Sequence, residues 1–198
     1  MPTLLTPFRY VTIRHQAKLL YDVILPITLG LAVSALLLGL TKPVPIFGKE
    51  AYLGQIQGLL TILGGFFVAA LTLITTDKSD MLGQPVGGLR PPRLPSERLP
   101  LSRRRFLAYL FGYLAASCFA LVALSVLANL VAPQIVSEVA AGKRFWLKAA
   151  FLVPFNIWLA HVSVATLLGL FYFTERLKIA NRTAKVGTPD AAPSPERS

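Results

Sequence analysis

The sequence is poor in the residues that build catalytic and metal sites. It has one cysteine, Cys118, so no intramolecular disulfide is possible and cysteine says nothing about an oxidising compartment. Its two histidines, His15 and His161, lie on different segments and lack metal-ligand spacing. No glycine-rich loop has the lysine of a nucleotide-binding motif, and no serine sits in a nucleophile elbow. We therefore expect no enzyme, no cofactor and no resident metal.

Apolar residues are abundant and come in long runs. They make up 54% of the 198 residues, and the mean hydropathy is +0.60. Each of four runs is long enough to cross a hydrocarbon core of about 30 Å at about 1.5 Å per residue. The sequence therefore predicts an all-α membrane protein, a bundle of four transmembrane helices. The predicted spans cover residues 19–40, 51–76, 106–131 and 149–174.

The segments between the spans differ in length and composition. Two short connections cover 41–50 and 132–148, whereas 77–105 is a long loop rich in proline and arginine. Residues 1–18 mix aromatic and basic side chains and resemble an interfacial arm. The polar composition of the tail, 175–198, is typical of a disordered segment.

Basic residues are distributed unevenly between the two sides that four spans define. The arm, the long loop and the tail hold three, seven and five Lys and Arg residues, against two and three in the short connections. The positive-inside rule then places both termini and the long loop in the cytoplasm. We expect a multi-pass protein of the cell inner membrane, whose formal charge of +11 reports topology and not nucleic-acid binding.

An arginine triplet, Arg103, Arg104 and Arg105, directly precedes the third span. Cations at a helix end attract anionic lipid headgroups, and this is the interpretation we favour. The alternative is a docking site for an acidic cytoplasmic partner; direct binding of nucleic acid is not expected.

Small and hydroxyl side chains form a stripe along the second span. At 100° per residue one face carries Gly54, Gly58, Thr61, Gly65, Ala69 and Thr72. Small residues four apart let another helix backbone approach closely, which predicts a packing seam and favours a homo-oligomer. A matching seam in the third span could come from Ala108, Gly112, Ala116 and Ala120. The alternative is that the threonines line a narrow aqueous path.

The fourth span has the most polar interior. Asn156 and His161 are its intramembrane polar candidates, and His161 is the single ionisable side chain predicted to lie deep in a span. It could relay a proton or hydrogen-bond across helices. Asp22 is assigned to the cytoplasmic border, where a local ion pair with Lys18 explains it. Tyr113 of the third span suits an interfacial aromatic belt.

Two stretches, GGFFVAALTLITT and SRRRFLAYLFGYLA, carry a family resemblance. Over residues 55–120 the chain resembles small four-helix membrane proteins of bacterial antiphage defence, specifically the KwaA-like membrane subunits of the Kiwa system. The resemblance implies an oligomeric inner-membrane component that senses phage-induced membrane change with a cytoplasmic, DNA-binding partner. It assigns no role to any single residue.

Together these features favour a non-enzymatic membrane sensor, scaffold or effector that oligomerises and binds a soluble cytoplasmic partner. The alternative function is a small oligomeric channel or transporter subunit, supported by the threonine stripe and His161.

Overall fold

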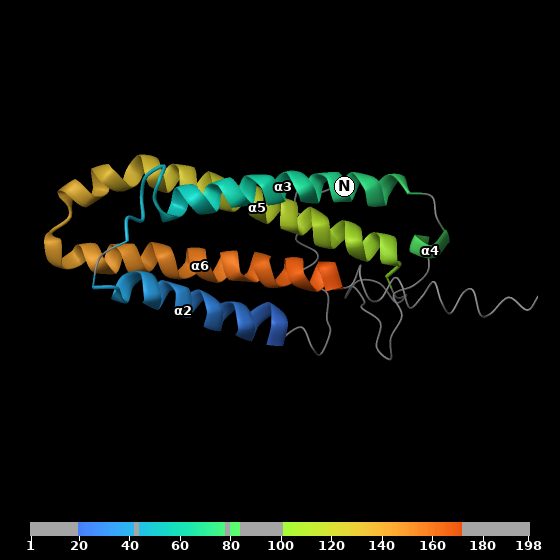
Figure 1. The fold of residues 1–198 in the computed structure, drawn as a ribbon, viewed down its shortest axis with the longest axis horizontal. Coiled ribbons are helices and arrows are strands. Elements are labelled where there is room, and N and C mark those ends of the chain that lie inside the picture. The colour runs from blue at the N-terminus through green and yellow to red at the C-terminus, as the bar shows by residue number, and fades with distance from the viewer. Residues whose placement is uncertain (1–19, 42–43, 78–79, 84–100, 172–198) are drawn as a thin grey trace, which may run out of the picture.

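The computed structural model describes residues 20–41, 44–77, 80–83 and 101–171, and this part of the chain is helical without strands (Figure 1). A short π-helix, η2 (Leu20–Ile24), leads directly into α2 (Leu25–Gly39). The helices that follow are α3 (Tyr52–Thr76), α4 (Asp80–Gly83), α5 (Arg103–Glu138) and α6 (Ala141–Phe171). The predicted arm at 1–18, the tail at 175–198 and most of the loop at 77–105 lie outside the described residues.

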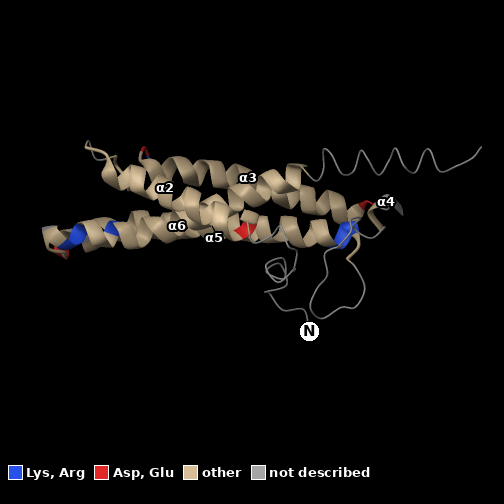
Figure 2. Cartoon of the chain, turned by 90° about the horizontal axis from the view of Figure 1, so that it is seen from below, with Lys and Arg blue, Asp and Glu red and all other residues tan. Residues whose placement is uncertain are grey.

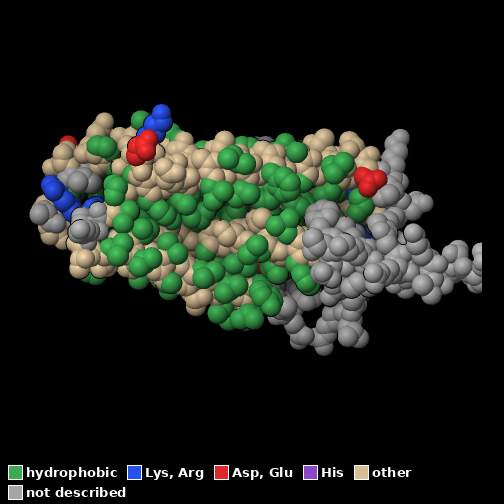
Figure 3. All heavy atoms as spheres, in the orientation of Figure 1, with side chains coloured by type: hydrophobic (Ala, Val, Ile, Leu, Met, Phe, Trp, Pro, Cys, Tyr) green, Lys and Arg blue, Asp and Glu red, His purple; other side chains and the backbone are tan. Residues whose placement is uncertain are grey.

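Four of the helical segments are long and apolar enough to cross a membrane. They are Leu20–Gly39, Tyr52–Thr76, Arg103–Ile135 and Gly142–Phe171. Basic side chains of the described helices gather at the two ends of the bundle (Figure 2), and hydrophobic side chains cover much of its flank (Figure 3). This distribution suits a bundle whose flank faces hydrocarbon and whose ends face water, so the structure indicates a multi-pass membrane protein.

The helices associate as two pairs and not in simple chain order. α3 packs along α5, and α2 packs along α6, so the first long helix pairs with the last one (Figure 1). The pairs meet mainly where α5 contacts α6, which makes α6 a helix with protein on two sides. Among the described elements, α2 and α3 make no direct helix–helix contact, although only a short connection separates them in sequence.

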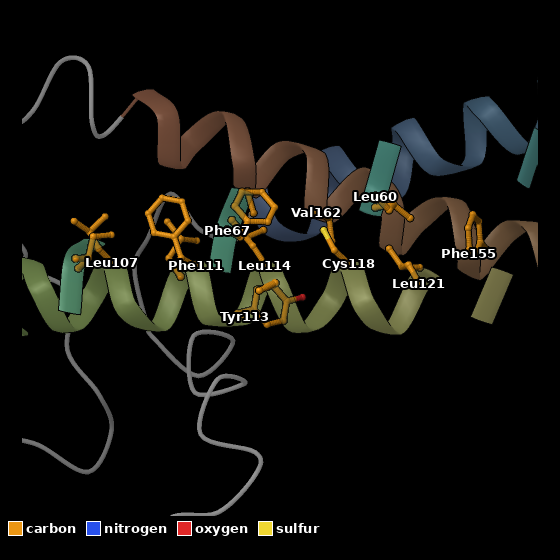
Figure 4. Close-up of a cluster of buried hydrophobic side chains, with 14 of the residues drawn as sticks. Leu60, Phe67, Leu107, Phe111, Tyr113, Leu114, Cys118, Leu121, Phe155 and Val162 are labelled. Atoms are coloured by element: carbon orange, nitrogen blue, oxygen red, sulfur yellow. The ribbon is translucent and has the colours of Figure 1, made fainter. Parts of the chain in front are cut away.

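A seven-residue repeat builds the α3–α5 interface. On α3 the repeat is Leu53, Leu60, Phe67 and Ile74, all at most 4% exposed. On α5 it is Leu107, Leu114 and Leu121, with Cys118 in the adjacent row, all fully buried. Figure 4 shows these α5 side chains in sequence along the helix. A repeat of seven is the signature of left-handed coiled-coil packing, the commonest geometry of membrane helix bundles.

The α2–α6 interface is a close backbone crossing. A Cβ built on Gly30 would lie 2.5 Å from Ile157 Cα, a distance that real Cβ atoms do not adopt. Gly30, Pro26 and Ser34 are the buried residues of α2 and recur every four positions. Small residues at this spacing let the two backbones approach until side-chain and main-chain polar groups can meet.

Two helix ends differ from the predicted spans. α5 continues through Pro133 to Glu138, whereas the sequence predicted an end at Val131. α6 begins at Ala141, eight residues before the predicted start of the fourth span. The predicted connection at 132–148 is therefore mostly helical, and Pro133 lies inside α5 without ending it.

Candidate functional site

A chain of hydrogen bonds links three helices through Asn156. The Tyr52 hydroxyl of α3 donates to Asn156 Oδ1 over 2.7 Å, and Asn156 Nδ2 donates to Ser34 Oγ of α2 over 3.0 Å. Ser34 Oγ in turn donates to the Gly30 carbonyl over 2.7 Å. Asn156 and Ser34 are 2% and 1% exposed. This Asn156 network ties both helix pairs together at one end of the bundle.

Burial strengthens the bond between Asn156 and Ser34, because both side chains are almost fully enclosed. Polar groups placed in a low-dielectric interior need partners, and here each of the three side chains has one. The order of donors and acceptors also fixes the orientation of the Asn156 side-chain amide. Its oxygen accepts from the tyrosine hydroxyl, and its nitrogen donates to the serine hydroxyl. The arrangement holds helices in register and presents no free reactive group.

His161 occupies a second polar cluster, between α6, η2 and α5. Its Nδ1 lies 3.0 Å from the backbone carbonyl oxygen of Asp22. Its ring meets the Tyr113 ring edge-on, with centroids 5.7 Å apart and planes at 75°. Tyr113 is only 5% exposed, and its hydroxyl lies beside Ser117 and Trp158. The Asp22 carboxylate is near enough to Tyr113 to interact with it electrostatically.

This His161 cluster differs from the sequence prediction at two residues. Asp22 lies at the depth of His161, which contacts Tyr113 about 15 Å from the start of α5, and not at the border of the bundle. Lys18, its predicted partner, lies outside the described residues. Tyr113 is a buried neighbour of His161 and not part of an interfacial belt. Sequence reasoning missed both because each helix is apolar on every side, so polarity does not reveal which faces meet.

The small-residue stripe of α3 faces away from α5. Gly58, Thr61, Gly65, Ala69 and Thr72 are all exposed within one chain. A Cβ on Gly58 or Gly65 would have no atom within 4 Å, so no described helix packs there. The glycine buried against α5 is instead Gly64, one residue along from Gly65, beside Cys118.

The remaining stripe residue, Gly54, has a local role. A Cβ there would collide with the Lys49 carbonyl, so glycine lets the preceding turn fold against the start of α3. The neighbouring Gly48 has a φ of +124°, which favours glycine, and its amide donates to Asn129 Oδ1 of α5 over 3.1 Å. These contacts anchor the short connection to the bundle.

The threonines of the stripe satisfy their own hydroxyls. Thr61 donates to the Gln57 carbonyl over 2.8 Å, and Thr72 donates to the Val68 carbonyl over 3.0 Å. Such bonds to the preceding turn let a hydroxyl face hydrocarbon or another helix without water. The stripe is therefore compatible with a dry contact face.

The arginine triplet forms the first turn of α5. Ser102 is the N-cap, and its Oγ accepts from the Arg105 amide over 3.4 Å. The amino end of a helix carries partial positive charge, so each of these three cations is destabilising there. The cost is roughly 0.3–1 kcal/mol for each arginine. An anionic surface at this end of the bundle would offset that cost.

The described residues contain no group of three or more His, Cys, Asp or Glu side chains placed to hold a metal. The site thus consists of two polar clusters inside the bundle and two surface features, the α3 stripe and the arginine triplet. Comparison with protein-family models, with curated proteins and with solved structures finds no match.

Proposed function

We propose that the protein is a non-enzymatic, multi-pass inner-membrane protein that self-associates through α3 and works as a sensor, scaffold or effector with a cytoplasmic partner. The observation that carries this proposal is the outward-facing stripe, since Gly58 and Gly65 leave open space where a second backbone could approach. Van der Waals packing of small residues drives helix association in a membrane, where the hydrophobic effect between helices is absent.

The flanks of the stripe suit the same role. Ile62 and Leu73 border one side of it and are 74% and 70% exposed, so they would form a ridge beside the flat glycine surface. A ridge beside a flat surface lets the ridge of one copy pack onto the flat surface of the other. The self-bonded threonines favour a packed contact over a water-filled path, and we therefore do not advance the channel alternative.

The arginine triplet supports the second part of the proposal, contact with anionic groups at the cytoplasmic face. Its unfavourable position on the helix dipole is compensated by lipid phosphates or by acidic side chains of a partner. The sequence resemblance over residues 55–120 adds antiphage defence as the proposed setting.

Substitutions on the stripe test self-association. Gly58→Leu and Gly65→Leu fill open space in one chain, so each should fold normally while weakening association at least about tenfold. Gly39→Leu is the matched control, because Gly39 also has no atom within 4 Å of its Cβ position but lies on α2. Native mass spectrometry of protein extracted in membrane nanodiscs measures the oligomer directly.

The same extraction recovers bound lipid and protein, which tests the partner. Replacing the arginine triplet with glutamine should reduce the anionic lipid or acidic protein recovered. The Lys143→Gln/Arg144→Gln pair, exposed at the opposite end of the bundle, should not. The proposal is contradicted if the wild-type protein stays monomeric and is recovered with neither anionic lipid nor an acidic partner protein. Oligomers that persist in both glycine variants would reject α3 as the interface.

A further inference from the structure

The hairpin formed by α5 and α6 extends past α2 and α3 at one end of the bundle (Figure 1). Two contacts mark the level at which the connection between α2 and α3 lies. The Gly48 amide donates to Asn129 Oδ1 of α5 over 3.1 Å. Phe47 packs against Phe151 of α6, with ring centroids 6.1 Å apart. From Asn129, α5 continues to Glu138, which adds about 14 Å of helix beyond this level.

The same level marks one boundary of the hydrocarbon core. From Phe151 to Phe171, where α6 ends, the helix rises about 30 Å, which equals the thickness of a hydrocarbon core. The first ten residues of α6, Ala141–Ala150, therefore lie outside that core. The headgroup layer on each side is about 5–8 Å thick. Trp146 precedes Phe151 by five residues, so it lies about 7 Å beyond the boundary, at the level of the headgroups.

The side chains at this level have the chemistry of a membrane interface. Trp146 and Phe145 are 72% and 51% exposed, and their rings meet edge-on with centroids 5.7 Å apart. Lys143 and Arg144 are also exposed and lie about 3–5 Å farther out along α6 (Figure 2). Aromatic side chains favour the headgroup level of a bilayer, and cations favour its phosphates. The order along α6 therefore matches the order of the layers in a phospholipid leaflet.

The tip of the hairpin is tied to both of its helices. Only Val139 and Ala140 separate α5 from α6. Arg144 Nε donates to the Val139 carbonyl over 3.1 Å, and the Lys143 amide donates to the Ala140 carbonyl over 2.9 Å. The first bond places a cation at the carboxyl end of α5, where the helix dipole favours it. The aromatic pair thus keeps a fixed depth relative to the bundle.

We propose that the tip of the α5–α6 hairpin is a phospholipid-binding surface, which seats Phe145 and Trp146 in the headgroup layer of the leaflet opposite the arginine triplet. Lys143 and Arg144 then meet lipid phosphates. Every phospholipid carries a phosphate, so this surface does not select anionic lipid. The proposal rests on insertion of the bundle in a bilayer and does not depend on self-association through α3.

Depth-dependent quenching of tryptophan fluorescence tests this surface. The chain has two tryptophans, so Trp158→Phe leaves Trp146 alone. The full-length variant is reconstituted in phosphatidylcholine vesicles that carry bromine either near the carbonyl end or near the middle of the acyl chains. The shallow bromine should quench Trp146 at least about twofold more strongly than the deep one. Trp146→Phe is the matched control, because Trp158 lies about 18 Å farther along α6 and should be quenched more by the deep bromine.

Acrylamide, a quencher that stays in water, distinguishes the other outcomes. If acrylamide quenches Trp146 strongly and neither brominated lipid does, the tip stands in water and the proposal is wrong. Weak quenching by all three probes would show that protein covers the tip, which equally rejects a lipid surface. If Trp158→Phe folds poorly, the difference between the wild-type protein and Trp146→Phe gives the Trp146 signal. Gly65→Leu should keep the wild-type pattern, so a failure of self-association leaves this test intact.

Discussion

Replacing Asn156 with alanine removes both interhelical bonds of the Asn156 network in one step. The Tyr52 hydroxyl loses its acceptor at 2.7 Å, while Ser34 keeps its bond to Gly30. Hydrogen bonds between membrane helices contribute about 0.6 kcal/mol on average and up to about 1.7 kcal/mol. Two of them, plus about 1 kcal/mol for the space left by the side chain, give an expected destabilisation of about 3 kcal/mol.

A double-mutant cycle separates the bonds from the packing. Tyr52→Phe alone should cost about 1 kcal/mol, because it deletes the hydroxyl and keeps the ring. In the Asn156→Ala background the same change should cost almost nothing, since the hydroxyl no longer has its partner. The coupling energy is then about 1 kcal/mol. Reversible unfolding in bicelles, followed by steric trapping, measures all four free energies.

Ser163→Ala provides the matched control on the same helix. Ser163 is exposed and donates to its own Leu159 carbonyl, so the change should stay within about 0.5 kcal/mol. If Tyr52→Phe costs as much with alanine at 156 as with asparagine, the two side chains do not interact, and the network does not link α3 to α6.

Two further predictions concern packing. Gly30→Ala should destabilise the fold by about 2–3 kcal/mol and disrupt the α2–α6 pair, because the added Cβ would lie 2.5 Å from Ile157 Cα. Gly39 lies on the same helix with open space around its Cβ position, so Gly39→Ala should leave the free energy of unfolding unchanged in the same assay. Cys118 is fully buried, so a membrane-permeant maleimide should label it at least about a hundredfold more slowly in the folded protein than after denaturation, and rapid labelling in native bilayers would contradict the α3–α5 packing.

The sequence predicts the four long helices well because length and apolar content suffice for them. Pairing is a different matter. In a soluble bundle the apolar face of each helix identifies its partner, but here every face is apolar, so α2 with α6 could not be anticipated. The seven-residue repeat from Leu53 to Ile74 was a readable signal for the face that meets α5. The adjacent small-residue stripe is the more conspicuous pattern, and it lies on another face.

In the candidate site, too, the sequence reveals some residues and hides the residues that they contact. Asn156 and His161 stand out in sequence because polar side chains are rare in an apolar run. Their partners do not, since Ser34 and Tyr52 are ordinary residues more than a hundred positions away. The partner of His161 is the Asp22 carbonyl, a backbone group, so the residue type gives no signal for it. Such contacts depend on three-dimensional register, which one sequence does not specify.

The pairing of the first long helix with the last one has a consequence for biosynthesis. At roughly 5–20 residues per second, α6 leaves the ribosome roughly 6–25 seconds after α2. During that interval α2 is without its partner, whereas α3 and α5 can already associate. The Ser34 hydroxyl does not need α6 as a partner during this interval, because it donates to the Gly30 carbonyl within α2 itself. Asn156 lacks such a local bond among those described, and it arrives last, when both of its partners are already in place.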